Sequence, residues 1–235
     1  MSISDMIQQV LSGTGATLTI FFSTLIISLP LGLLVALIRM SDIRPFRRLE
    51  SNSRGVQLLK RFNPIRLIVQ FFISVLRGTP LMLQLIVWYY GPYYLFEIRL
   101  TPEWRITATV LGFSINYAAY FAEIFRSGIQ GISPGQREAA KVLGYNRVQT
   151  FFKVIFPQMI KQVLPPVTNE IITLVKDTSL AFVLVYVEIF TLAKQVAAAQ
   201  STIVPLFIAG AFYYVFNLLV AVVMGRVEKK MNYYQ

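Results

Sequence analysis

The stretch Glu138-Ala139-Ala140-Lys141-Val142-Leu143-Gly144 is a polar, cationic interruption between two long apolar segments of the chain. Nine residues after it comes a second short stretch, Val154-Ile155-Phe156-Pro157. Residue types that favour helix ends lie around both stretches, so the interruption carries more structural signals than a passive loop. We therefore expect a folded element between the two apolar segments.

The composition of the chain points to a membrane protein. Hydrophobic residues make up 55% of the 235 residues, which is more than is usual in a soluble domain. Apolar runs of about 20 residues, the length with which a helix crosses a bilayer, recur along the chain. The alternating segments of about ten residues that a membrane β-barrel requires do not occur. The composition therefore predicts an all-α integral membrane protein.

The positive charge is placed as in a membrane protein and not as in a nucleic-acid-binding protein. The net charge is +11, but 17 of the 22 Lys and Arg residues fall in three blocks, at 39–66, 126–161 and 226–230. Each block lies between apolar segments or after the last one. Because Lys and Arg near the ends of spans mark the cytoplasmic side, we expect the blocks and the C-terminus to be cytoplasmic.

Five membrane-spanning helices are predicted within a single domain that covers residues 1–235. Their approximate ranges are 15–39, 79–96, 102–125, 163–187 and 203–225, and Pro30-Leu31-Gly32 interrupts the first. Residues 1–13 hold no Lys or Arg, so we expect a retained first span and not a signal peptide. Five spans with a cytoplasmic C-terminus place the N-terminus outside. Residues 188–201 are predicted to form a short helix on the outer face.

Residues 65–77 have an amphipathic pattern, with apolar side chains on one helical face and Arg66 and Arg77 on the other. This pattern favours a helix lying at the cytoplasmic interface, followed by the span at 79–96. The alternative is one long helix over 65–96, kinked at Gly78-Thr79-Pro80. We favour the first arrangement because it leaves Arg77 at the membrane boundary.

The interruption with which we began is predicted to hold two short helices within residues 130–158. Ser133-Pro134-Gly135-Gln136 has the form of a capping box, and Gly144 suits the left-handed end of the first helix. Asn146, with Gln149 three residues on, can cap a second helix that ends by Pro157. This pair of helices would fit a cleft on a partner protein. The alternative is a solvated hairpin that only joins two spans.

These motifs together resemble the signature of ABC importer permeases of type I. The family pattern is Glu-Ala-Ala, three residues, Gly, nine residues and Ile-x-Leu-Pro, from which Val154 and Phe156 are mild departures. Three other segments resemble the polar amino-acid branch of the family, and they lie at residues 77–81, 122–129 and 176–180. The resemblance covers the chain from about Arg77 to Leu180.

The resemblance implies that residues 130–158 dock into a groove on a separate ATPase subunit. The residues expected to carry this coupling are Glu138, Ala139, Ala140, Gly144 and Pro157. The chain has no Gly-x-x-x-x-Gly-Lys-Ser/Thr motif, so it is predicted not to be an enzyme, and ATP with its Mg²⁺ belongs to the partner. Further expected partners are a second permease copy or a similar permease, an extracytoplasmic amino-acid-binding protein and the bilayer.

Polar side chains within the predicted spans suggest a substrate path between the third and fourth spans. Charges at mid-bilayer cost about 2.5–3.5 kcal/mol each on insertion scales and usually face a cavity or a partner. The candidates are Asp177, Glu123, Asn116, Thr79, Lys176 and Thr173, whereas the absence of Cys and His argues against a metal site. The alternatives are structural: Glu123 can pair with Arg126, and Arg77 can anchor to lipid phosphate or a helix end.

We therefore expect a bacterial plasma-membrane permease that moves polar or charged amino acids by alternating access. One alternative is a secondary transporter or channel driven by an ion gradient, but the chain lacks histidine and visible inverted repeats. Another is a membrane scaffold or sensor that only recruits an ATPase.

Overall fold

The structure is a computed structural model that describes residues 2–41 and 62–231. Every regular element within these ranges is a helix, which confirms the predicted all-α class. Most of the first basic block, at residues 42–61, lies outside the described ranges.

The first two helices are α1 (Ile3–Leu11) and α2 (Thr14–Met40). α2 runs on through Pro30, so the predicted interruption at Pro30-Leu31-Gly32 is wrong. The helix persists there because it packs along α6 (Pro102–Gly131). At Gly32 the two helices are so close that an added Cβ atom would lie 2.7 Å from Cβ of Phe121.

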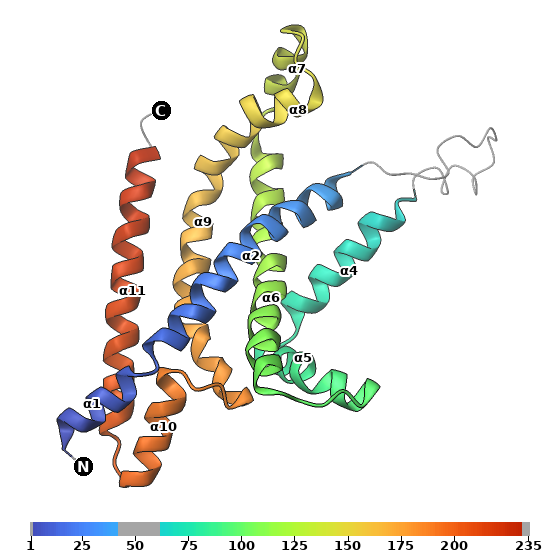
Figure 1. Cartoon of the computed structure of the whole chain (residues 1–235). Helices are drawn as coiled ribbons and strands as arrows, with labels where there is room; N and C mark the ends of the chain where they lie inside the picture. Colours follow the sequence, from blue (N-terminus) through green and yellow to red (C-terminus); the bar gives the residue numbers. More distant parts are fainter. Residues whose placement is uncertain (1, 42–61, 232–235) are drawn as a thin grey trace.

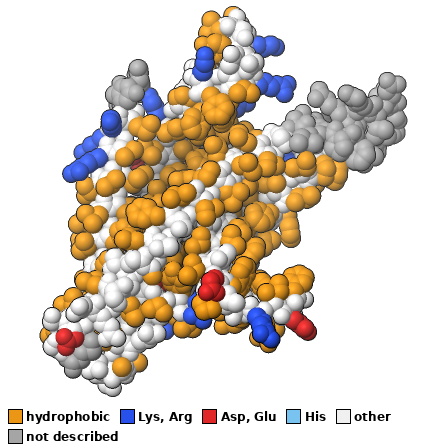
Figure 2. Space-filling view, viewed as in Figure 1, with side chains coloured by type: hydrophobic (Ala, Val, Ile, Leu, Met, Phe, Trp, Pro, Cys, Tyr) orange, Lys and Arg blue, Asp and Glu red, His pale blue; other side chains and the backbone are white. Residues whose placement is uncertain are grey.

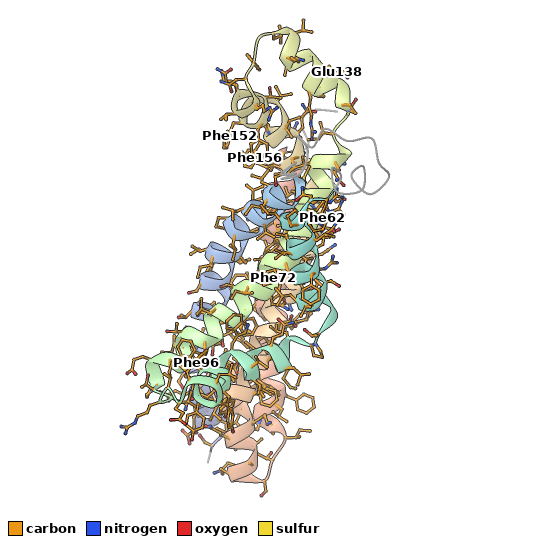
Figure 3. All side chains as sticks on the ribbon, turned by 90° about the vertical axis from the view of Figure 1, so that its right-hand side faces the viewer. Phe62, Phe72, Phe96, Glu138, Phe152 and Phe156 are labelled. Atoms are coloured by element: carbon orange, nitrogen blue, oxygen red, sulfur yellow. The ribbon has the colours of Figure 1, made fainter. Side chains whose placement is uncertain are left out.

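α4 (Pro64–Gly78) and α5 (Leu81–Phe96) are separate helices that meet at an angle of 110°. α4 slants along α2 and α6, and Phe72 lies near the middle of the molecule (Figures 1 and 3). The amphipathic pattern predicted a helix that lies flat at the cytoplasmic interface. α4 does not lie flat across one end of the bundle, so this prediction differs from the structure. The reason is that Ile73 and Leu76 are buried in the common core, which draws the second half of α4 inside.

α6 is the central helix, and it extends beyond the predicted end at residue 125. Its start is as predicted, because the Thr101 side chain accepts a hydrogen bond from the backbone N–H of Trp104 and Pro102 begins the helix. Phe113, Tyr117 and Phe121 are fully buried along it. α6 therefore provides the surface against which the neighbouring helices pack.

α7 (Pro134–Val142) and α8 (Arg147–Thr150) protrude from one end of the bundle (Figure 1). α8 passes through a π-helical turn, Phe151–Ile155, into α9 (Phe156–Asp177), so the predicted end at Pro157 is wrong. Pro157 stands in the first turn of α9, where its missing N–H costs no α-helical bond. The chain therefore runs from the protruding segment into the bundle without a loop.

A 3₁₀ helix, Thr178–Leu184, leads from α9 to α10 (Ile189–Gln200) and α11 (Val204–Met231). α10 confirms the short helix predicted at 188–201. α1, α10 and the N-terminus lie at the end of the bundle opposite α7 and α8, whereas α11 brings the C-terminus back toward them (Figure 1). The two termini are therefore at opposite ends of the molecule.

Residues 3–40 and α11 are each long and apolar enough to cross a membrane. The number of possible spans rises to four if α4 with α5, and residues 147–184 with α10, each count as one bent span. α6 is not among them, although it is long enough, because its sequence is less apolar. Apolar side chains dominate the visible face, and most Lys and Arg side chains lie toward the α7 end (Figure 2).

Candidate functional site

A cavity of about 280 Å³ opens between the end of α4 and the facing sides of α6 and α9, and we call it the central cavity. Its lining residues are Arg77, Tyr120, Glu123, Ile124, Arg126, Ser127, Gly128, Gln162, Val163, Pro166 and Glu170. The sequence predicted a polar path between these helices, and of its candidates Glu123 lies on the cavity wall. The candidates of the fourth span, Thr173, Lys176 and Asp177, lie further along α9 than the residues that line the cavity.

Arg77 reaches the central cavity from the last turn of α4. Its guanidinium carbon lies 5.1 Å from the ring centroid of Tyr120, within range of a cation–π contact. Within the described part of the chain, Arg77 has no ion-pair partner. Its N–H donors are therefore available to an anionic group in the cavity.

Glu170 faces the same cavity from α9. The charge of Arg77 is near enough to act on this carboxylate, but the two side chains do not form an ion pair. No hydrogen bond or ion pair engages Glu170 among the residues that the structure describes. One unpaired cation and one unpaired anion thus share a single cavity.

Glu123 is already neutralised. Its two carboxylate oxygens are ion-paired with Arg39 of α2 and with Arg126 one turn further along α6. The pairing with Arg126 is the structural alternative that the sequence suggested. Glu123 can therefore bind a substrate ammonium only by releasing one of these arginines.

Asn116 and Thr79 belong to a hydrogen-bond network that holds the bend between α4 and α5, in which Asn116 is buried and Thr79 is exposed. The Gln84 side-chain amide donates to the Leu76 carbonyl at 2.8 Å and to the Thr79 hydroxyl at 2.8 Å. Asn116 donates to Leu76 at 3.1 Å and to the Gln84 carbonyl oxygen at 3.0 Å. These contacts satisfy the main-chain group that the bend frees, so neither residue offers an unused donor to the cavity.

Asp177, Lys176 and Thr173 lie toward the C-terminal end of α9 and do not line the central cavity. Asp177 accepts a hydrogen bond of 2.7 Å from the Tyr117 hydroxyl. The Thr173 hydroxyl donates to the main-chain carbonyl of Asn169. The sequence placed Lys176 and Asp177 near the centre of a span, whereas the α-helix ends at Asp177 and a 3₁₀ helix follows.

The sequence analysis did not propose Glu170 as a site residue, and it interpreted Arg77 as an anchor. A signal for Glu170 was present, because an ionisable residue within a predicted span is by default a candidate for function. Gln162, Pro166 and Glu170 also repeat at intervals of four, which places them on one helical face. Arg77 could not be placed without knowing that α4 turns inward.

We call residues 130–158 the coupling segment. Most of the local features that the sequence predicted for it are present in the structure. Gly144 adopts φ +78°, the left-handed conformation that favours glycine. Asn146 and Gln149 form the predicted capping box, with bonds of 2.9 and 3.0 Å. The box predicted from Ser133 to Gln136 does not form, because the Ser133 side chain makes no capping bond.

The outer surface of the coupling segment is partly apolar. Glu138 and Ala139 are exposed, whereas Ala140 is buried and so cannot face a partner. Among the aromatic residues of this segment, Phe152 is exposed, whereas Tyr145, Phe151 and Phe156 are half-buried. The most exposed apolar side chains are instead Val142 and Leu143, at 88% and 73%. Glu138 lies at the tip of the molecule (Figure 3).

Comparison with known proteins assigns the family. The sequence profile described as "Binding-protein-dependent transport system inner membrane component" matches residues 55–233. The chain belongs to this family. It is the permease subunit of an ABC transport system. The alternative of a secondary transporter or channel driven by an ion gradient is therefore not favoured.

Two permeases of Bacillus subtilis (strain 168) are among the similar proteins. The arginine transport system permease protein ArtQ is 35% identical over 95% of this chain and 92% of its own length. The L-cystine transport system permease protein TcyB is 32% identical over 98% of this chain and 92% of its own length. The permease therefore matches these relatives almost from end to end.

Solved structures share the fold of this permease. A chain from the crystal structure of an amino acid ABC transporter with histidines has a TM-score of 0.79 at 31% identity, covering 98% of this chain and 99% of its own. A chain of the MetNI methionine ABC transporter in an inward-facing conformation has a TM-score of 0.70 at 15% identity, covering 99% and 100%. The second likeness shows the fold alone, which is that of a type I importer permease.

Proposed function

We propose that this permease passes polar or charged amino acids through the central cavity by alternating access, powered by a separate ATPase. The observation that carries this proposal is that Arg77 and Glu170 both line one cavity, each without an ion-pair partner in the described part of the chain. A cavity of about 280 Å³ lies just below the range of about 300–1,000 Å³ that is typical of drug-sized ligands, so it suits one small molecule.

The chemistry of an amino acid matches these two groups. Its carboxylate can take paired hydrogen bonds from the Arg77 guanidinium, which presents donors in a rigid fork. Its ammonium, or a cationic side chain, can be received by Glu170. Arginine, cystine and glutamine, which the names of similar permeases give as substrates, share the α-ammonium and α-carboxylate groups.

The partners in this proposal are two ATPase subunits, a second permease copy or a similar permease, and an extracytoplasmic binding protein. The ATPase would seat on the exposed apolar surface around Val142 and Leu143, and would carry the ATP and Mg²⁺. The N-terminus lies outside and the C-terminus in the cytoplasm. Two observations support this orientation: the termini are at opposite ends, and the C-terminus is toward the coupling segment (Figure 1).

Uptake into proteoliposomes that hold the permease, its ATPase and its binding protein tests this proposal. Arg77→Gln and Glu170→Gln should each lower substrate uptake about tenfold or more, because a hydrogen bond to a charged group is worth about 1.5–3 kcal/mol. Basal ATPase activity should remain. Arg99→Gln and Glu97→Gln are matched controls, since both residues are exposed in the connection between α5 and α6.

Other results would replace the proposal. Normal uptake by both cavity variants would remove the central cavity from the substrate path. Uptake driven by an ion gradient in vesicles without the ATPase would point to secondary transport. Stimulated ATPase activity without uptake of any amino acid would point to a membrane scaffold or sensor.

A further inference from the structure

Three arginines from three helices meet in a second, smaller cavity. It measures about 120 Å³ and is lined by Arg39, Met40, Arg66, Arg126 and Gln130. We call it the arginine pocket. Arg39 comes from the last turn of α2, Arg66 from the first turn of α4 and Arg126 from α6, and these ends of α2 and α4 lie together (Figure 1). The pocket shares only Arg126 with the central cavity.

The arginine pocket has more positive charge than its neighbours neutralise. Arg39 and Arg126 both pair with the single carboxylate of Glu123. Arg66 has no ion pair or hydrogen bond from its side chain within residues 2–41 and 62–231. Three guanidinium groups thus face one carboxylate, which leaves an excess of two positive charges among the described side chains.

Unused hydrogen-bond donors accompany this excess charge. Arg126 donates to Glu123 and to Gln130, yet its Nε atom is buried without a partner among the described residues. Arg126 lines both cavities, and because a buried unpaired donor is costly, an anion that draws this guanidinium into the arginine pocket would supply the missing acceptor. The N-terminus of α4 is at the same place, and its helix dipole also favours a negative charge.

We propose that the arginine pocket binds the phosphate of an anionic phospholipid. Guanidinium groups match phosphate oxygens in paired hydrogen bonds, and basic pockets between membrane helices on the cytoplasmic side bind anionic headgroups. A soluble phosphate would meet the same donors. The lipid is favoured because Leu67, Ile68 and Phe71 present exposed apolar side chains on α4, the helix that carries Arg66. Acyl chains can cover this surface while the phosphate sits at the helix end.

The side chains of the protein link two of the three helices around the arginine pocket, and a bound phosphate would link all three. Glu123 already links Arg39 of α2 to Arg126 of α6, whereas Arg66 of α4 is not part of that link. The phosphate would add Arg66 and so fix the beginning of α4 to the ends of its neighbours. This inference does not depend on which substrate the permease carries, because lipid binding is measured directly.

The test is native mass spectrometry of the full-length permease, purified with its ATPase subunit and titrated with phosphatidylglycerol or phosphatidylcholine. Arg66→Gln should weaken phosphatidylglycerol binding about five- to tenfold, the effect of about one arginine–phosphate contact. Arg66→Lys should keep most of the binding because it keeps the charge. Arg99→Gln, an exposed arginine away from the pocket, is the matched control and should bind as the unchanged protein does.

A parallel titration with inorganic phosphate and glycerol 3-phosphate distinguishes the sources of the phosphate. Preference for phosphatidylglycerol over phosphatidylcholine, lost in Arg66→Gln alone, supports the lipid site. Equal binding of phosphatidylglycerol by all variants overturns it. Arg66-dependent binding of inorganic phosphate, with no preference between the two lipids, overturns the lipid assignment and gives the pocket to a soluble anion.

Discussion

Three carboxylates near the centre of the permease have three different surroundings. Glu123 is held by two arginines, and Asp177 accepts a hydrogen bond from the Tyr117 hydroxyl. Glu170 has neither kind of partner in the described chain and faces the central cavity. Of the three, Glu170 can bind an ammonium group without breaking an existing contact, so we propose Glu170 for the substrate role that the sequence suggested for Asp177.

Asp177→Asn should leave uptake within about twofold of the unchanged permease. The asparagine carbonyl can still accept the Tyr117 hydrogen bond, and the residue does not line the cavity. Glu170→Gln, a substitution of the same kind, should lower uptake about tenfold or more because it removes an unpaired charge from the cavity wall. Initial uptake rates of the two variants in the same vesicles give the comparison. A severe loss in Asp177→Asn with normal uptake in Glu170→Gln would return the site to Asp177.

At the scale of helices, the bend between α4 and α5 decides where Arg77 points. Gln84 lies at the centre of the network that holds this bend, because it bonds to Leu76, Thr79 and Asn116. Gln84, Leu76 and Asn116 are buried, so the bonds among them replace bonds that water can no longer supply. These polar residues hold the bend, and a role of Asn116 and Thr79 in the substrate path stays a prediction.

Gln84→Ala should lower the thermal midpoint of the purified complex. The change removes one of the two hydrogen bonds to the buried Leu76 carbonyl and leaves one N–H of the buried Asn116 amide without its acceptor, and an unpaired buried group costs about 1–3 kcal/mol. Gln195→Ala, at an exposed position of α10, is the matched control and should change the midpoint little. Scanning calorimetry or a thermal-shift assay in detergent measures both. An unchanged midpoint in Gln84→Ala would mean that packing alone holds the bend.

The approach of α6 to α9 depends on a small residue. A Cβ atom added at Gly128 would lie 2.1 Å from Cγ1 of Val163, on the cavity wall. Gly128→Ala should therefore force the helices apart, at about 1–3 kcal/mol for an overpacked core, and reduce both thermal stability and uptake. Gly210→Ala is the control on α11, where no atom lies within 4 Å of the added Cβ. Equal stability of the two variants would contradict this close packing.

Local capping signals predicted helix starts correctly where packing against other helices did not override them. Asn146 caps its helix as predicted, and the helix expected from residue 102 does begin there behind the Thr101 cap, because a cap is made within about one turn of the chain. The predictions failed at Pro30 and Pro157, since packing carries one helix past its proline and the other proline fits a first turn. The cavity-facing side of α9 was missed because several faces of that helix carry polar residues.

At the scale of the whole permease, one helical path joins the coupling segment to the cavity. α8, the π-helical turn and α9 follow one another without a loop, and α9 carries Gln162, Pro166 and Glu170 on the cavity wall. We therefore expect a displacement of α7 and α8 to reach the cavity through this path. The π-helical turn is the place where this path can bend, because such turns are local departures from α-helical bonding.

Gly144→Val should uncouple ATP hydrolysis from uptake while the permease still inserts into the membrane. Gly144 joins α7 to α8 at φ +78°, and holding a non-glycine residue in such a conformation costs about 1–3 kcal/mol, most for a β-branched one. The strain would turn α7 away from the partner surface, whereas the cavity, built from α4, α6 and α9, stays intact. ATPase activity should then no longer respond to substrate and binding protein. Gly144→Asn is the matched variant, because asparagine tolerates the left-handed region and nothing lies within 4 Å of an added Cβ. Normal stimulated uptake in Gly144→Val would show that the glycine does not set the angle through which the ATPase acts on the permease.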